Sequence, residues 1–222
     1  MQLLLLAGCG SSPNAPPDPG DPIYLPQPIP IADTPVHLVQ RFEIVFEYQD
    51  LVNYEPLLTD DFHFQFSADA DPELFYRYPN WNIDDDIEST KHLFEGFVNT
   101  PGELVPAASR IDIALSGVQL EADSTHADST RHYGKIAVAA FEMTIEFPTN
   151  SDPVTYHLVA PHDFYVVRGD AAVLPGGTAA DSTRWYIRRW MDRAPAPIAA
   201  KSPVLDATAP TTMGQIKDRY RK

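Results

Sequence analysis

The sequence predicts an α+β protein in which helices come first and a sheet follows. Apolar residues in the first half recur mainly at helical spacing, whereas residues 109–193 contain long runs in which polar and apolar residues alternate. The chain is 44% hydrophobic and has one cysteine, so it can form a core but no internal disulfide. Helices followed by a run of strands are typical of the α+β class.

The first expected element is an amphipathic helix that begins at Pro35 and ends near Tyr54, before Pro56. Thr34 is suited to cap this helix, and proline is favoured at the first helical position because the N–H there has no partner to lose. The apolar residues that repeat at helical spacing are Leu38, Val39, Phe42, Val45, Phe46 and Val52. We expect this face to be buried.

A short strand, a brief helix and a second long helix are expected next. Phe62, Phe64 and Phe66 alternate with polar residues, which is typical of a strand with one apolar face. A brief helix is predicted from Pro72 to Tyr78. After Trp81, acidic residues favour a helix N-terminus, where negative charge is stabilised. These acids are Asp84, Asp85, Asp86 and Glu88, and the expected core residues are Ile87, Phe94, Phe97 and Val98.

The remainder of the domain is predicted to be an antiparallel meander of four long strands. Their alternation places them at residues 109–121, 132–147, 154–168 and 183–193. The first two are joined by residues 123–130, and the last two by a segment that contains Pro175-Gly176-Gly177. Both connections have the composition of exposed turns.

The two ends of the chain are predicted to lie outside this domain. Residues 10–34 are rich in proline, which fixes φ and removes a donor, so we expect an N-terminal tether without regular secondary structure. Residues 195–222 are predicted to be a linker and a short C-terminal helix. Met213, Ile216 and Tyr220 share one face of this helix, which we expect to pack on the domain.

Cys9 is the predicted lipidation site. Leu6-Ala7-Gly8-Cys9 resembles the lipobox of bacterial lipoproteins, in which the cysteine thiol carries the lipid. The resemblance implies that residues 1–9 are the end of a truncated signal peptide, and because no Lys or Arg precedes Cys9, the true start is expected upstream. It also implies a cell-envelope location, with Gly10 favouring the outer membrane over the inner. The alternative is an incidental cysteine.

Two further stretches resemble the nuclear transport factor 2-like, or cystatin-like, superfamily. They are the stretch from Phe42 to Phe66, which contains the turn from Tyr54 to Phe62 into the first strand, and the closing stretch from Trp185 to Arg193. The resemblance covers about residues 34–194, and the domain is placed at 35–194. It implies a cone in which a curved antiparallel sheet wraps a long N-terminal helix. Proteins of this fold include isomerases, dehydratases, hydrolases, transport adaptors and secretion-machine subunits, so the fold alone does not assign an activity.

Composition restricts the classes of partner. The formal charge of −15 repels phosphate backbones, so nucleic-acid binding is not expected. The seven histidines offer no pair with metal-ligand spacing, and one cysteine cannot form a thiolate cage, so no metal or other cofactor is expected. The expected partners are a membrane, through the lipid, and a small apolar ligand, with a homodimer through the sheet as an alternative.

Three polar residues of the predicted sheet are candidates for acid–base chemistry. Glu142, His157 and Asp163 would form such a set if they faced the interior of the cone. Glu142 has the same parity as Ile136 and Val138, so either it points inward or a bulge reverses the strand. The alternative is that all three lie on the solvent face, where polar residues of antiparallel sheets are usually found.

Aromatic residues are candidates for a ligand pocket. Phe42, Phe64, Trp81 and Trp185 could line an apolar cavity, although aromatic side chains at such spacings more often form the core. The leading hypothesis is a non-enzymatic, lipid-anchored domain that binds a small apolar ligand or a protein. The alternatives are an isomerase, dehydratase or hydrolase that uses a buried carboxylate, and an envelope scaffold subunit that dimerises through its sheet.

Overall fold

The computed structural model describes residues 28–100, 102–126, 132–149, 153–193 and 212–221, and these form an α+β cone. One curved sheet has the strand order β1-β7-β6-β5-β4, in which β1 pairs with β7 in parallel and the other neighbours are antiparallel. The strands are β1 (Leu58–Gln65), β4 (Arg110–Ala122), β5 (Tyr133–Phe147), β6 (Val154–Arg168) and β7 (Trp185–Asp192). The predicted fold class and the four-stranded meander are therefore confirmed.

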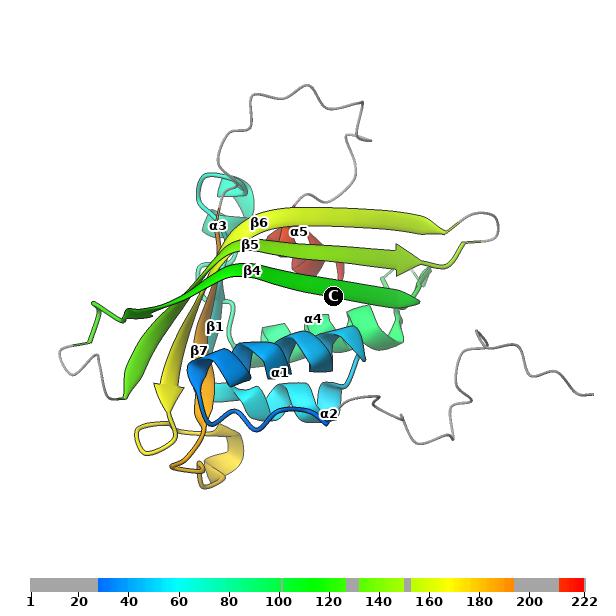
Figure 1. Cartoon of the computed structure of the whole chain (residues 1–222). Coiled ribbons are helices and arrows are strands. Elements are labelled where there is room, and N and C mark those ends of the chain that lie inside the picture. The colour runs from blue at the N-terminus through cyan, green and yellow to red at the C-terminus, as the bar shows by residue number, and fades with distance from the viewer. Residues whose placement is uncertain (1–27, 101, 127–131, 150–152, 194–211, 222) are drawn as a thin grey trace, which may run out of the picture.

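The helices are α1 (Pro35–Glu47), α2 (Leu51–Tyr54), α3 (Pro72–Arg77), α4 (Ile83–Glu95) and α5 (Met213–Arg219), with single 3-10 turns η1 (Glu55–Leu57) and η2 (Pro175–Gly177). Of these, α1, α2, α4 and α5 lie on the concave side of the sheet, and α3 follows the end of β1. A two-residue hairpin pairs β2 (Phe97–Val98) with β3 (Leu104–Val105). Figure 1 shows β4, β5 and β6 bending over α1, with α4 and α5 beneath them. Among the described residues, no helix has the length and apolarity to cross a membrane.

The first helix is shorter than the sequence predicts. Thr34 caps it as expected, accepting a hydrogen bond from the His37 N–H at 3.1 Å. The helix nevertheless ends at Glu47, because Gln49 adopts a left-handed φ of 54° and Asp50 caps a new turn, α2, by accepting from the Asn53 N–H. Val52, expected on the buried face, is consequently 81% exposed.

The second long helix also ends earlier than expected. Gly96 follows Glu95 with a φ of 73°, and a Cβ at this position would lie 2.8 Å from the Ala107 backbone nitrogen. A close approach of this kind at positive φ requires glycine and ends the helix. Phe97 and Val98 therefore belong to β2, and Val98, predicted to be a core residue, is 62% exposed.

A bulge in β5 decides which of its side chains face the core. Val138 pairs with His162 and Phe141 with Ala160, so β5 has one residue more than β6 in this interval. The inward parity changes there, from Ile136 and Val138 to Phe141, Met143, Ile145 and Phe147. Glu142 is thereby turned outward, which settles the two alternatives left open by its parity.

Aromatic side chains fill the interior of the cone. Phe42 of α1 lies among them, and its ring contacts those of Phe46, Tyr54, Phe141, Phe164 and Trp190. The centroids of Phe42 and Trp190 are 5.2 Å apart at 83°, the edge-to-face arrangement that aromatic pairs favour. This packing fixes α1 against the sheet, so the space between them is core.

The C-terminal helix α5 completes the core at the open end of the cone. Met213, Ile216 and Tyr220, the residues predicted to share a face, are all buried. Tyr220 donates a hydrogen bond to the Pro106 carbonyl oxygen at 3.0 Å, which fixes the end of the chain to the loop after β3. The expectation that this helix packs on the domain is confirmed, and in Figure 1 it lies between the sheet and α4.

Candidate functional site

The candidate acid–base residues of the sheet lie on its outer face. Glu142 and His157 are exposed, and His157 Nδ1 is 3.1 Å from the Thr144 hydroxyl oxygen on the neighbouring strand. Asp163 is 4% exposed, but it points away from the core between Lys135 Nζ at 3.5 Å and an Arg193 guanidinium nitrogen at 3.4 Å. The structure therefore does not bring these three residues to the interior of the cone.

The four aromatic candidates do not surround a common cavity either. Phe42 and Trp81 are buried in the core, and Trp185 is half-buried at the start of β7. Phe64 lines a pocket at the edge of the sheet. Cys9 and residues 10–27 of the predicted tether lie outside the described residues.

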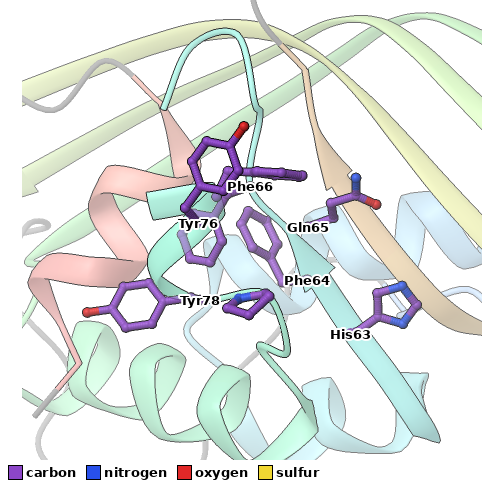
Figure 2. A pocket seen from close by; sticks show the side chains of 8 residues that line it. His63, Phe64, Gln65, Phe66, Tyr76 and Tyr78 are labelled. Carbon is purple, nitrogen blue, oxygen red and sulfur yellow. The ribbon is translucent and has the colours of Figure 1, made fainter. Parts of the chain in front are cut away.

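A pocket of about 320 Å³ lies along the edge of β1 that does not pair with β7. We call it the β1-edge pocket, and it is lined by His63, Phe64, Gln65, Phe66, Phe75, Tyr76, Tyr78 and Pro79. Figure 2 shows the labelled side chains of β1 and of the segment around α3 arranged about it. Tyr76 is 79% exposed, which is unusual for a large aromatic side chain.

The lining of the β1-edge pocket suits an uncharged apolar ligand. Five of its eight residues are aromatic, and none is an acid, a lysine or an arginine. Burial lowers the pKa of His63, so its imidazole is neutral at neutral pH and provides one donor and one acceptor. Gln65 adds an amide. Mostly apolar walls with a few polar groups are typical of small-molecule sites.

A second group of functional side chains is fully buried under α5. The Asp86 carboxylate of α4 accepts hydrogen bonds from the Tyr54 hydroxyl at 2.7 Å and from Lys217 Nζ at 2.5 Å. Lys217 is 1% exposed and reaches this position from α5. Burial lowers the pKa of Lys217, although Asp86 opposes this shift, and burial raises the pKa of Tyr54.

Two aromatic rings complete the surroundings of the Lys217 ammonium. Its Nζ lies 4.9 Å from the ring centroid of Trp190 and 5.2 Å from that of Phe64. Both distances are within the range of cation–π attraction. We call Tyr54, Phe64, Asp86 and Trp190 the ammonium cage. All four belong to the body of the domain, and the ammonium group comes from the C-terminal helix.

A buried histidine and carboxylate lie beside this cage. Trp190 Nε1 donates to His162 Nδ1 at 2.9 Å, so the proton of the neutral imidazole is on Nε2, which faces Asp192 Oδ1 at 3.8 Å. Asp192 Oδ2 accepts from the Gly214 N–H at 3.0 Å, whereas Oδ1 has no hydrogen-bond partner among the described residues. Burial raises the pKa of Asp192 to about 7 and lowers that of His162 to about 3.

Within the described ranges, no cluster of three or more His, Cys, Asp or Glu side chains has the geometry of a metal site. The lining of the β1-edge pocket is suited to contact an apolar ligand, and the cage is suited to hold an ammonium group. Proton exchange at Asp192 is a third capacity, because a carboxyl group with a pKa near 7 is present in both protonation states at neutral pH.

The described part of the chain is thus an α+β cone whose interior is closed by its own C-terminal helix. No protein-family model matches the sequence, and no curated protein does. Among solved structures, the chain is similar to a nuclear transport factor 2-like superfamily protein from Salmonella enterica serovar Typhimurium. The two share 11% identity over 76% of this chain and 93% of that chain, with a TM-score of 0.46.

Two other similar structures are a protein of unknown function with a cystatin-like fold and a ketosteroid isomerase-like protein. The first, from Nostoc punctiforme, is 10% identical over 74% of this chain and 90% of that chain, with a TM-score of 0.39. The second, from Erwinia carotovora atroseptica, is 10% identical over 72% of this chain and 92% of that chain, with a TM-score of 0.41.

Proposed function

We propose that the chain is a lipid-anchored protein of the bacterial cell envelope whose cone domain binds a small apolar ligand in the β1-edge pocket. The observation that carries the binding function is the aromatic lining of this pocket, in particular the exposed ring of Tyr76. The interior of the cone is filled by packed rings, so a pocket at the edge of β1 is the more accessible place for a ligand. Lipidation of Cys9 rests on the lipobox resemblance alone.

An enzyme that uses a buried carboxylate is the second candidate, and Asp192 is the observation that favours it. Its raised pKa suits a general acid or base, and it lies in the wall of a further pocket of about 280 Å³ at the end of β1. Asp192 is not part of the β1-edge pocket, however. We therefore regard binding without turnover as the function that the geometry supports best.

A scaffold that dimerises through its sheet has less support. A dimer of that kind needs a broad uncharged surface, whereas the outer face of β4 and β5 carries Arg110, Glu142 and Glu146. Arg110 and Glu146 lie opposite each other in register. These charges would have to be desolvated or paired across a two-fold axis.

Replacing Tyr76 by alanine tests the binding function. We expect the affinity for an uncharged aromatic probe, N-phenyl-1-naphthylamine, to fall at least about fivefold, because an exposed aromatic wall of the pocket is removed while the core is untouched. The measurement is fluorescence titration of the probe. Leu104→Ala, which removes an exposed apolar side chain on β3, should bind as the unsubstituted protein does.

Equal affinity of the Tyr76→Ala and Leu104→Ala variants would contradict the assignment of the pocket. Chemical conversion of the bound compound by the unsubstituted protein, but not by an Asp192→Asn variant, would favour the enzymatic alternative instead.

Replacing Cys9 by serine tests the anchor. The chain is expressed in a bacterium with a complete lipoprotein signal upstream of residue 3, and membrane and soluble fractions are compared. We expect Cys9→Ser to move the protein out of the membrane fraction, because serine lacks the thiol to which the lipid is attached, and Ser11→Ala to leave it there. Membrane retention of Cys9→Ser would refute lipidation and leave the binding function unaffected.

A further inference from the structure

The ammonium cage consists of residues that are positioned without the C-terminal helix. Tyr54 and Asp86 lie on α2 and α4, which contact each other, and Phe64 and Trp190 lie on the strands β1 and β7, which pair in register at these two residues. The Tyr54 hydroxyl holds one oxygen of Asp86, and the other oxygen accepts from Lys217. The main body of the domain therefore presents a carboxylate oxygen and two aromatic rings toward α5.

We propose that this cage is a binding site for an organic cation, a primary ammonium group on an apolar chain, and that Lys217 of α5 is its tethered occupant. The site is distinct from the β1-edge pocket in its ligand, because that pocket has no charged lining. A carboxylate supplies a charge-assisted hydrogen bond to an ammonium group, and aromatic faces attract the same group without competing for its protons. The apolar chain of a ligand would occupy the volume that the Lys217 methylenes now fill.

The charge of the surface beneath α5 matches this ligand class. Asp71, Asp86 and Asp192 all lie under the helix and are buried by it or beside it. Asp71 accepts from Thr212 and from Gln215 Nε2, and Asp192 accepts from the Gly214 N–H. The ionised carboxylates among them attract cations and disfavour anions.

The identity of residue 217 is better explained by ligand mimicry than by core packing. A buried ion pair is expensive to desolvate, and well-packed apolar residues at the same positions are commonly as stabilising or more so. Methionine at position 217 would fill the core at the end of the cone without a charge. Lysine instead places there the chemical group for which the cage is suited.

The attachment of helix α5 to the domain allows a ligand to displace Lys217 from the cage. It contains seven residues, too few for a stable helix on its own, so its structure depends on docking. In sequence it is joined to β7 through residues 194–211, and its docking is therefore an intramolecular binding equilibrium. The docked state leaves the buried Asp192 Oδ1 unpaired beside Gly214, which reduces the net stability of docking.

The test uses the full chain and n-hexylammonium chloride, with uncharged 1-hexanol as the matched control ligand. Amide hydrogen exchange of residues 212–221 is measured at increasing concentrations of each compound. We expect n-hexylammonium to accelerate exchange in this segment saturably, because it displaces Lys217 and releases α5, and we expect 1-hexanol to have no such effect. Unchanged exchange, or equal acceleration by both compounds, would overturn the proposal.

Variants of Lys217 show whether n-hexylammonium competes with this residue for the cage or binds elsewhere on the protein. Lys217→Ala removes the internal competitor, so n-hexylammonium should bind to it at least about tenfold more tightly than to the unsubstituted protein, as measured by calorimetry. Lys91→Ala removes a surface lysine of α4 that faces Glu95 and should leave the affinity unchanged. Lys217→Met also removes the ammonium group, but its side chain fills the volume that the apolar chain of the ligand needs, so it should gain less affinity than Lys217→Ala does. If neither Lys217 variant binds the amine more tightly than Lys91→Ala does, the cage is not its site.

Discussion

Replacing Asp86 by asparagine is expected to lower the free energy of unfolding by about 3–5 kcal/mol. Asparagine has the shape of aspartate, so no cavity forms and the Tyr54 hydroxyl retains an acceptor. The loss arises because the Lys217 ammonium is left in a buried site without an anionic partner. Breaking one side of a buried ion pair costs more than the pair itself contributes.

Urea denaturation of a double-mutant cycle measures this effect. Lys217→Met alone leaves the Asp86 carboxylate buried and is also destabilising, whereas the double variant has neither charge and should lie within about 1 kcal/mol of the unsubstituted protein. Glu95→Gln is the control, because it breaks the exposed Lys91–Glu95 pair, and pairs of this kind contribute little. If Asp86→Asn were no less stable than Glu95→Gln, the buried pair would not have the role assigned to it.

The helices and strands could be predicted because residues that are buried on one face of an element recur at a regular spacing in the sequence. The alternation of residues 132–147 predicted β5 almost to its ends, since one face of the strand packs on α1. The bulge at residues 139 and 140 could not be located from that pattern, because a break in parity is equally consistent with an inward-facing Glu142. The partner strand β6, which keeps one parity from Leu158 to Val166, decides between the two.

The buried charges were missed because each has an ordinary local explanation. Asp86 is one of several acids at a helix N-terminus, and Lys217 is one of several basic residues at a helix C-terminus. The sequence nevertheless contained an indication that both residues are buried. Asp86 shares a helical face with Thr90 and Leu93, and Lys217 follows Met213 by one turn. The face of α4 that carries Asp86 packs against the face of α5 that carries Lys217. This tertiary contact cannot be predicted from local patterns in a single sequence.

The remaining large effect concerns pH and depends on His162 and Asp192 together. Unfolded, the two side chains have ordinary pKa values of 6.5 and 3.8, so between about pH 4 and pH 6 the histidine is protonated and the aspartate is not. Folded, burial lowers the first pKa to about 3 and raises the second to about 7. The pair therefore holds one proton in both states, and its contribution to stability is flat across this interval.

Replacing Asp192 by asparagine removes one side of this compensation. In the folded variant His162 is neutral above about pH 3, whereas in the unfolded variant it binds a proton below about pH 6.5. Because the unfolded state then binds more protons, the free energy of unfolding rises with pH, by about 1.4 kcal/mol per pH unit relative to the unsubstituted protein. The opposite variant, His162→Asn, retains an acceptor for Trp190 and leaves Asp192 alone, so its stability should fall with rising pH across the same interval.

The measurement is urea denaturation of all three proteins from pH 4 to pH 6, with the variants plotted as differences from the unsubstituted protein. Titrating groups that interact with neither His162 nor Asp192 cancel in these differences. Two difference lines of opposite slope would show that each side chain is neutral in the folded protein once its neighbour has been replaced.

The slopes alone do not distinguish two buried neutral groups from a buried ion pair. If Asp192 and His162 formed an ion pair, each single replacement would leave an unpaired charge, and that group would change its protonation state to avoid the cost. The unsubstituted protein would bind the same number of protons in that case, so the stabilities at pH 6 decide between the two descriptions. An ion pair requires both variants to be less stable than the unsubstituted protein at this pH. Two independently buried neutral groups require Asp192→Asn to be more stable than the unsubstituted protein, because asparagine does not have to bind a proton on folding.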